Sequence, residues 1–303
     1  MLPFSRVAII GLGLIGSSLA RAVRQHMPTV HLTGTDIDEA VRVRVHELGL
    51  VDDVADSPGA AVVDADLVIL AVPLGAFASV GAEIAPELSP GTLVSDVGSA
   101  KQTVIDTLGP LLPHGVQLVP AHPVAGTERS GPDAGFAQLF EGRWCILTPQ
   151  PGTPESTVTR LAEFWTRLGS KVDVMDARHH DLVLAVTSHI PHLIAYSIVG
   201  TAADLEGVTR GEVIKYSAGG FRDFTRIAAS DPTMWRDVFL TNKDAVLEVL
   251  GRVSEDIAAL QRAIRWGEGD TLFQRFSQSR DIRRAIVEAG QDTAAPDFGR
   301  NPG

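Results

Sequence analysis

The chain has 303 residues, of which 45% are hydrophobic and 21% charged, a balance that excludes a disordered chain, a collagen-like fibre and a disulfide scaffold. Its 26 Lys and Arg residues against 37 Asp and Glu give a formal net charge of −11, so we expect neither nucleic acid nor a membrane as a partner. An anionic ligand must then be held by a local positive site.

The first half of the chain alternates short apolar runs with longer amphipathic ones. Strands are predicted at residues 7–10, 31–35, 67–72, 92–96 and 116–121, with helices at 15–24, 39–48, 76–88 and 101–112 between them. Two more strands, 143–148 and 171–175, flank a helix at 154–168. This alternation predicts an α/β fold: a Rossmann-type, doubly wound and mostly parallel sheet with right-handed crossovers.

Long helical patterns dominate after about residue 176. They cover residues 177–203, 233–267 and 270–289, and no strand pattern of comparable strength occurs among them. We therefore predict a nucleotide-binding domain at 1–176, an all-helical domain at 177–289 and a frayed tail at 290–303.

The stretch 182–203 contains no Asp, Glu, Lys or Arg and is long enough to cross a bilayer. It also contains His189, His192 and Pro191, and imidazoles are costly in the middle of a membrane. We expect a helix buried within the protein instead. The single cysteine, Cys145, lies in an apolar run and is expected to be a buried hydrophobe, which fits a cytoplasmic protein.

A dinucleotide-binding motif follows the first strand. Residues 11–16 read Gly-Leu-Gly-Leu-Ile-Gly and open the first helix, and Asp36 ends the second strand twenty residues past Gly16. Gly11 permits a tight turn, Gly13 lets a pyrophosphate approach the backbone, and Gly16 allows close helix–strand packing. Leu14 and Ile15 lie at the N-terminus of the helix, which offers free N–H groups to the phosphates.

The acidic residue of this motif also bears on the choice of cofactor. Asp36 can accept both ribose hydroxyls and would repel a 2′-phosphate, and Ile37 follows where an arginine could have favoured NADP. NAD is therefore the expected cofactor. Val72 and Pro73, at the end of the strand 67–72, either face the nicotinamide or only pack in the core.

Polar residues follow two of the later strands. Ser99 and Lys101 come just past the strand 92–96, where ligands bind in open α/β sheets, although Asp96 and Ser99 could instead cap the next helix. His122 comes just past the strand 116–121. A neutral imidazole there can take a hydroxyl proton while a hydride moves to NAD.

Two histidines and two arginines stand out in the helical half. His189 and His192 lie three apart, on one face if the helix continues, and we interpret them as substrate-binding residues or, alternatively, as buried structural histidines. The spacing also suits zinc, but no further ligand is obvious nearby, so we expect no metal site. Arg222 and Arg226 follow a glycine pair and could hold a carboxylate in a bidentate manner, or form a solvated pair on a helix face.

The chain resembles the prephenate/arogenate (cyclohexadienyl) dehydrogenases. The stretches that carry the resemblance are 11–16, 96–101 (DVGSAK), 122–131 (HPVAGTERSG), 139–142 (LFEG), 188–192 (SHIPH) and 219–235 (GGFRDFTRIAASDPTMW). The resemblance extends from residue 7 to about residue 250, over four-fifths of the chain. Other nicotinamide dehydrogenases share only the first of them.

The resemblance implies an NAD-dependent oxidative decarboxylation of prephenate to 4-hydroxyphenylpyruvate, or of arogenate to tyrosine, in tyrosine biosynthesis. It implies that His122 takes the hydrogen bond of the substrate hydroxyl, that Ser99 supports this histidine, and that Arg226 grips a carboxylate. It also places six residues in or near the substrate pocket: His189, His192, Arg222, Thr127, Glu128 and Trp235. A homodimer formed through the helical domain is expected as well.

Two other functions fit the same architecture. A β-hydroxyacid or imine dehydrogenase usually depends on a lysine in the helical half, but Lys215 and Lys243 have no supporting motif here. An inactive NAD-binding paralogue would keep the glycine motif and Asp36, yet it need not retain His122, Ser99 and Arg226 together.

Overall fold

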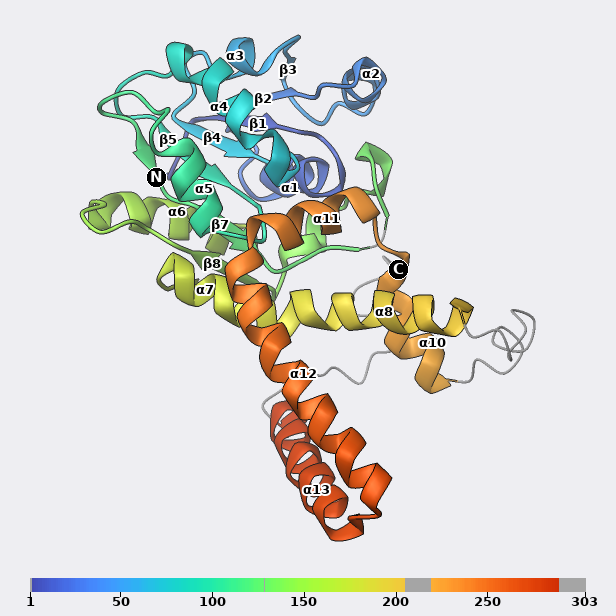
Figure 1. The fold of residues 1–303 in the computed structure, drawn as a ribbon. Coiled ribbons are helices and arrows are strands. Elements are labelled where there is room, and N and C mark those ends of the chain that lie inside the picture. The colour runs from blue at the N-terminus through green and yellow to red at the C-terminus, as the bar shows by residue number, and fades with distance from the viewer. Residues whose placement is uncertain (1, 128, 205–218, 289–303) are drawn as a thin grey trace. The chain divides into compact units, whose positions relative to one another are not determined.

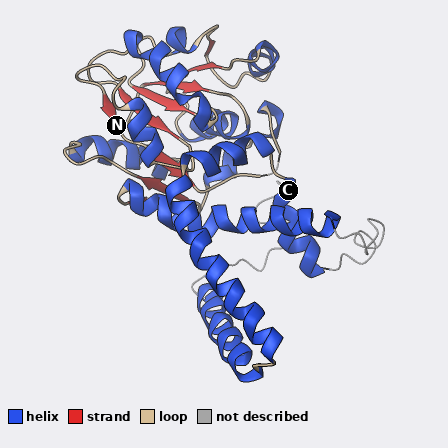
Figure 2. Ribbon diagram, viewed as in Figure 1, coloured by secondary structure: helices blue, strands red, loops and turns tan. Residues whose placement is uncertain are grey.

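The computed structural model describes residues 2–127, 129–204 and 219–288. These form two compact units, one up to Val246 and one from Leu247 onward, and the boundary falls inside α12 (Lys243–Trp266). The strands all lie before residue 177, and the described residues after it are helices and the turns between them (Figures 1 and 2). The domain boundary predicted at residue 176 differs from the division between these two units, and it stays a prediction.

The first unit is built on a six-stranded parallel sheet in the order β3-β2-β1-β4-β5-β6. The strands are β1 (Arg6–Ile10), β2 (His31–Thr35), β3 (Asp53–Val54), β4 (Leu67–Leu70), β5 (Leu93–Asp96) and β6 (Gln117–Leu118). The helices between them are α1 (Leu14–His26), α2 (Glu39–Glu47), α3 (Pro58–Ala61), α4 (Phe77–Ile84) and α5 (Gln102–Leu108). The order reverses between β1 and β4, and ligands of such sheets bind at the carboxyl ends of the strands beside this switch point.

Both faces of this sheet are buried, because side chains alternate along each strand. In β1, Val7 and Ile9 join one core cluster with Leu19 of α1, while Ala8 and Ile10 join another with Phe77 of α4. The predicted doubly wound α/β architecture is confirmed. The short β3 and α3 were not predicted, since elements of two and four residues show no periodicity.

The predicted strand at 116–121 is wrong as a single element. Residues 117–118 form β6 of the large sheet, whereas β7 (Ala121–Pro123) belongs to a second sheet with β8 (Trp144–Leu147) and β9 (Lys171–Val174). The break includes Pro120, which has no N–H to continue the parallel ladder. As a consequence His122 lies within a strand and is only 8% exposed, not in a loop past a strand.

The remaining elements of the first unit are mainly helical. They are α6 (Glu155–Arg167) between β8 and β9, then α7 (Ala177–Leu184), a π-helical turn η5 (Ala185–His189), α8 (Ile190–Asp204), α10 (Gly219–Thr225) and α11 (Pro232–Thr241). Short 3₁₀ turns include η1 (Leu74–Ala76) after β4 and η6 (Arg226–Ala229) after α10. Cys145 of β8 is fully buried, as expected, and its burial raises the pKa of the thiol.

The apolar stretch 182–203 is not buried within this chain as expected. Val186, Ile198 and Val199 are 38–53% exposed, whereas Leu184, Ile190 and Ala195 are buried, so the described residues cover only part of the stretch. Among the described residues, Ala177–Asp204 is the one helical stretch whose length and composition alone would allow it to cross a membrane.

The second unit contains the rest of α12 and α13 (Gly269–Ile286), which lie side by side (Figure 1). Gly267 adopts a φ of +68° at the end of α12, a left-handed conformation that reverses the chain without a side-chain clash. Arg275 on α13 donates to Asp256 on α12 at 2.9 Å. Residues 289–303, the predicted tail, lie outside the described residues.

The glycine turn after β1 yields a stability prediction. An alanine Cβ at position 16 would lie 1.9 Å from the carbonyl oxygen of Gly11, a backbone atom that cannot move freely. Gly16→Ala should therefore lower the free energy of unfolding by about 3 kcal/mol, measured by urea denaturation. At Gly13 a Cβ would meet nothing within 4 Å, so Gly13→Ala should change stability by less than about 0.5 kcal/mol. Equal urea midpoints for the two variants would contradict this account.

Candidate functional site

The glycine turn is shaped to receive a phosphate group. Gly11 has a φ of +94°, and a Cβ there would lie 2.6 Å from the carbonyl oxygen of Ala71. The space beside Gly13 is empty, and the first turn of α1 carries no acidic residue. Leu14 and Ile15 form that first turn. Its free N–H groups and the positive end of the helix dipole suit a pyrophosphate.

Asp36 is held at the end of β2 by backbone N–H groups. One carboxylate oxygen accepts from Leu12 N–H at 2.8 Å and the other from Asp38 N–H at 3.0 Å. These contacts place the carboxylate against the glycine turn, where it can face a ribose. Sequence reasoning missed Arg42, whose guanidinium donates to the Asp36 carbonyl at 2.7 Å, so a cation stands six residues past Asp36.

Val72 and Pro73 follow β4 beside the same turn. A methyl carbon of Val72 lies 2.9 Å from where a Gly11 Cβ would stand, while Pro73 is exposed. The next residues form η1, against which α11 packs. The end of β4 is thus adjacent to both the nucleotide turn and a helix of the later part of the chain.

A fully buried ion pair lies beyond the end of β5. The Lys101 ammonium donates to the Asp96 carboxylate and, at 2.8 Å, to the Ala121 carbonyl. Asp96 also accepts from the N–H groups of Gly98 and Ala121 at 2.7 and 3.2 Å. Burial raises the pKa of Asp96 and lowers that of Lys101, and the opposite charge of each partner offsets this effect. The pair joins β5 to β7, directly beside His122.

His122 is part of a buried chain of three titratable side chains. Its Nδ1 lies 2.9 Å from His180 Nε2, and His180 Nδ1 lies 2.9 Å from an oxygen of Asp181. Burial lowers the pKa of His122 well below 6.5, and the proximity of the basic groups of His180, Lys101 and His189 lowers it further. The ring of His122 is therefore neutral near pH 7, and one of its nitrogens has a lone pair that can accept a hydrogen bond.

Asp181 also caps α5 from another helix. Its two carboxylate oxygens accept from the N–H groups of Lys101 and Gln102 at 2.7 and 2.9 Å. Capping of this helix by Asp96 or Ser99, the alternative considered from sequence, is not observed, because Asp181 occupies the helix N-terminus. Ser99 lies half-buried in the turn between β5 and α5.

His189, His192 and Trp235 form a second cluster. The His192 ring stacks on Trp235 with centroids 3.6 Å apart, and His189 meets the same indole edge-on at 6.1 Å. Asn242 on the loop after α11 lies 3.1 Å from His189 Nδ1. His189 Nε2 and Trp235 Nε1 are buried without a hydrogen-bond partner among the described residues. Burial lowers the pKa of His189 to about 4.

The predicted arginines fall into different environments. Burial lowers the pKa of His192 and the charge of Arg226, at the start of η6, lowers it further, although Arg226 is itself exposed. The Arg222 side chain is 75% exposed and pairs with Asp223 at 3.2 Å. Within the described parts of the chain, no contact joins it to His122 and its partners or to the cluster of His189, His192 and Trp235. Thr127 is half-buried and accepts from Arg129 N–H, while Glu128 lies outside the described residues.

Sequence reasoning missed His180, Asp181 and Asn242. The adjacent pair His180-Asp181 matched no motif, because catalytic histidine–carboxylate pairs are defined by spatial geometry and not by sequence position. Asn242 carried no signal either, because its partners lie 53 and 61 residues away. Residues 2–127, 129–204 and 219–288 contain no cluster of three His, Cys, Asp or Glu side chains that could hold a metal.

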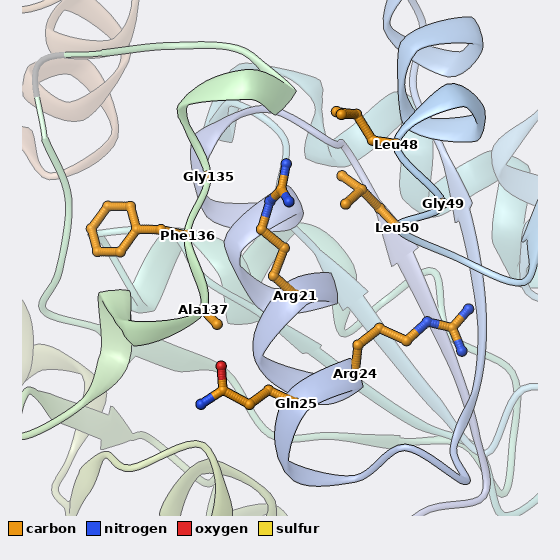
Figure 3. A pocket seen from close by; sticks show the side chains of 9 residues that line it. All are labelled: Arg21, Arg24, Gln25, Leu48, Gly49, Leu50, Gly135, Phe136 and Ala137. Carbon is orange, nitrogen blue, oxygen red and sulfur yellow. The ribbon is translucent and has the colours of Figure 1, made fainter. Parts of the chain in front are cut away.

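An open pocket of about 550 Å³ lies elsewhere, along the later turns of α1 (Figure 3). Arg21, Arg24 and Gln25 of α1 and Phe136 line it, together with Leu48–Leu50 and the backbone around Gly135. None of the predicted site residues contributes to it, and it contains no acid–base pair, so we assign it no chemistry.

Comparison with known proteins connects these features. Residues 19–174 match the family model for the nucleotide-binding domain of prephenate dehydrogenase, and residues 176–278 match the model for its dimerization domain. A cyclohexadienyl dehydrogenase of Zymomonas mobilis is 46% identical over 94% of this chain and 97% of its own length. A prephenate dehydrogenase of Bacillus subtilis is 36% identical, over 92% and 76%.

Solved structures agree. The crystal structure of prephenate dehydrogenase from A. aeolicus in complex with hydroxyphenyl propionate and NAD+ matches with a TM-score of 0.86 at 31% identity, and covers 93% of this chain and 98% of that one. Both family models and two relatives, 46% and 36% identical, match most of this chain, which therefore belongs to the prephenate dehydrogenase family.

Proposed function

We propose that the protein catalyses the NAD-dependent oxidative decarboxylation of prephenate to 4-hydroxyphenylpyruvate, of arogenate to tyrosine, or of both, within tyrosine biosynthesis. The observation that carries this proposal is His122, a buried and neutral imidazole beside the ion pair of Asp96 and Lys101. The named activities of its relatives and the NAD+ complex of the A. aeolicus enzyme support the substrate class and the cofactor.

The reaction removes a hydride from ring C4 and carbon dioxide from ring C1, and the electron pair of the broken C–C bond completes the aromatic ring. Bound NAD supplies the hydride acceptor. His122 accepts the hydrogen bond of the C4 hydroxyl and stabilises the positive charge that develops there as the hydride leaves. Ser99, in the turn that follows β5, supports this contact.

The substrate side of the site is made by the second cluster. In this proposal Arg226 binds a substrate carboxylate, and His189, His192 and Trp235 line the pocket. The absence of a hydrogen-bond partner for the buried His189 Nε2 and Trp235 Nε1 among the described residues supports their assignment to this pocket. Thr127, Arg222 and Glu128 would stand at the mouth of the pocket, although Arg222 points to solvent in this chain and Glu128 is not described.

The cofactor side uses the glycine turn and the end of β4. Gly11, Gly13, Leu14, Ile15 and Gly16 would hold the pyrophosphate, Asp36 the ribose, and Val72 and Pro73 the nicotinamide side. Asp36 favours NAD because its carboxylate would repel a 2′-phosphate. Arg42, bound to the Asp36 carbonyl, weakens this discrimination and is a reason to assay NADP as well.

A homodimer through the helical region is part of the proposal. The match to a dimerization domain supports it, as do the exposed apolar side chains on α8 and α12, among them Ile198, Val199 and Leu247. We propose a cytoplasmic enzyme with the division 1–176, 177–289 and 290–303.

The direct test is NADH or NADPH formation followed at 340 nm, with NAD or NADP combined in turn with prephenate or arogenate. We expect turnover with NAD and prephenate, and the arogenate rate measures how strictly the pocket selects the side-chain keto group. No turnover in any of the four combinations, with NAD binding shown separately, would favour an inactive paralogue or another substrate.

His122→Asn should lower kcat by about 10²–10⁴-fold, because the amide is a poor proton acceptor, while NAD affinity changes little. Steady-state kinetics with calorimetric NAD titration would measure both quantities. His114→Asn, the same change on an exposed histidine, is the control. Equal kcat values in the two variants would remove His122 from the reaction.

Arg226→Ala should mainly raise KM for prephenate, by about 10- to 100-fold, because a charged hydrogen bond to a carboxylate is lost. The kcat value should fall less than kcat/KM. Arg252→Ala, on the exposed side of α12, provides the matched control. If KM is the same in both variants, Arg226 does not bind the carboxylate.

A further inference from the structure

The chain Asp181–His180–His122 runs from α7 into β7 and is buried along its whole length. His180 is 0% exposed and Asp181 5%. The links are Asp181 Oδ1 to His180 Nδ1 and His180 Nε2 to His122 Nδ1, each 2.9 Å long. The two imidazole rings meet edge to face, with an interplanar angle of 72°.

Asp181 is held so that its carboxylate can only accept. Its oxygens already receive the N–H groups of Lys101 and Gln102 at the start of α5. Its own carbonyl accepts from the Asn242 amide at 2.9 Å, which fixes the backbone as well. An acceptor in this position requires a proton on His180 Nδ1.

The remaining protons follow from the chemistry of neutral imidazole, which carries one proton and one lone pair. Because burial lowers the pKa of His180, that ring is neutral, and its Nε2 must accept. His122 Nδ1 must then donate, so His122 Nε2 keeps its lone pair. The carboxylates of Asp181 and Asp96 favour a charged His180, and burial outweighs them.

We propose that His180 and Asp181 are positioning residues that hold His122 as its Nδ1–H tautomer, so that Nε2 is the atom that accepts the hydrogen bond of the substrate hydroxyl. This inference rests on the proposed function for its catalytic meaning. The tautomer itself is a property of the free protein and can be measured without substrate. In serine proteases, a base in the wrong tautomer loses about four orders of magnitude in rate.

The first test is the ¹⁵N NMR spectrum of the full chain with labelled histidine, at pH 7.5 and without ligands. The His122→Asn variant assigns the His122 resonances by their absence. We expect the shift and one-bond coupling of a protonated nitrogen at His122 Nδ1 and of an unprotonated nitrogen at Nε2. A proton on Nε2, or averaged shifts at both nitrogens, would overturn the inference.

The second test is kinetic. His180→Phe keeps a ring of similar size but removes the acceptor, while Asp181 keeps both backbone donors from α5. We expect kcat to fall by about 10- to 1,000-fold with KM for prephenate and NAD within about twofold, because the pocket is unchanged and only the tautomer is released. His179→Phe, the same substitution on the exposed neighbour, should leave both constants unchanged.

A third variant separates positioning from packing. His180→Gln presents an amide oxygen that can accept from His122 Nδ1, so it should restore kcat toward the wild-type value and keep the Nδ1–H signal. Wild-type kcat in His180→Phe, or no recovery in a folded His180→Gln, would overturn the inference. If His180→Phe does not fold, the wild-type spectrum alone decides. If the wild type shows no turnover, the proposed function fails while the tautomer is still measured.

Discussion

The carboxylate of Asp181 is the contact on which the site depends most. It satisfies two N–H groups at the start of α5 and orients His180. The backbone carbonyl of Asp181 accepts from the Asn242 amide, which also lies beside His189 Nδ1. These partners come from α5, α7, η5 and the loop after α11. Because unsatisfied buried charges and donors are costly, each partner restricts the others to one arrangement.

The ion pair of Asp96 and Lys101 also fixes the position of a neighbouring element of the site. Its two members are fully buried, and loss of one partner of such a pair typically costs about 3–5 kcal/mol because a lone charge remains. The pair binds both the N–H and the carbonyl of Ala121, so it sets the position of the strand that carries His122. The reactive imidazole thus stands on β7, between two charge networks, and not on a free loop.

The backbone brings the cofactor side and the substrate side of the proposed site together. The switch point of the sheet lies between β1 and β4, and the glycine turn and Val72 follow these two strands. The 3₁₀ turn after β4 contacts α11, which carries Trp235 and hence the cluster with His189 and His192. The absence of side chains at Gly11 and Gly16 therefore lets α1 pack against the glycine turn, and lets the turn pack against the end of β4.

Much of this protein could be read from its residues alone. The glycine turn, Asp36, the parallel sheet and the family motifs depend on local spacing and strand periodicity, which a sequence displays directly. The tertiary structure alone decided that residues 116–121 divide between two sheets, that Asp181 rather than Asp96 or Ser99 caps α5, and that His180 supports His122. The division between two sheets depends on strand pairs 22 to 26 positions apart, and the other two features depend on contacts 58 to 80 positions apart. No local pattern encodes which buried donor will find which acceptor.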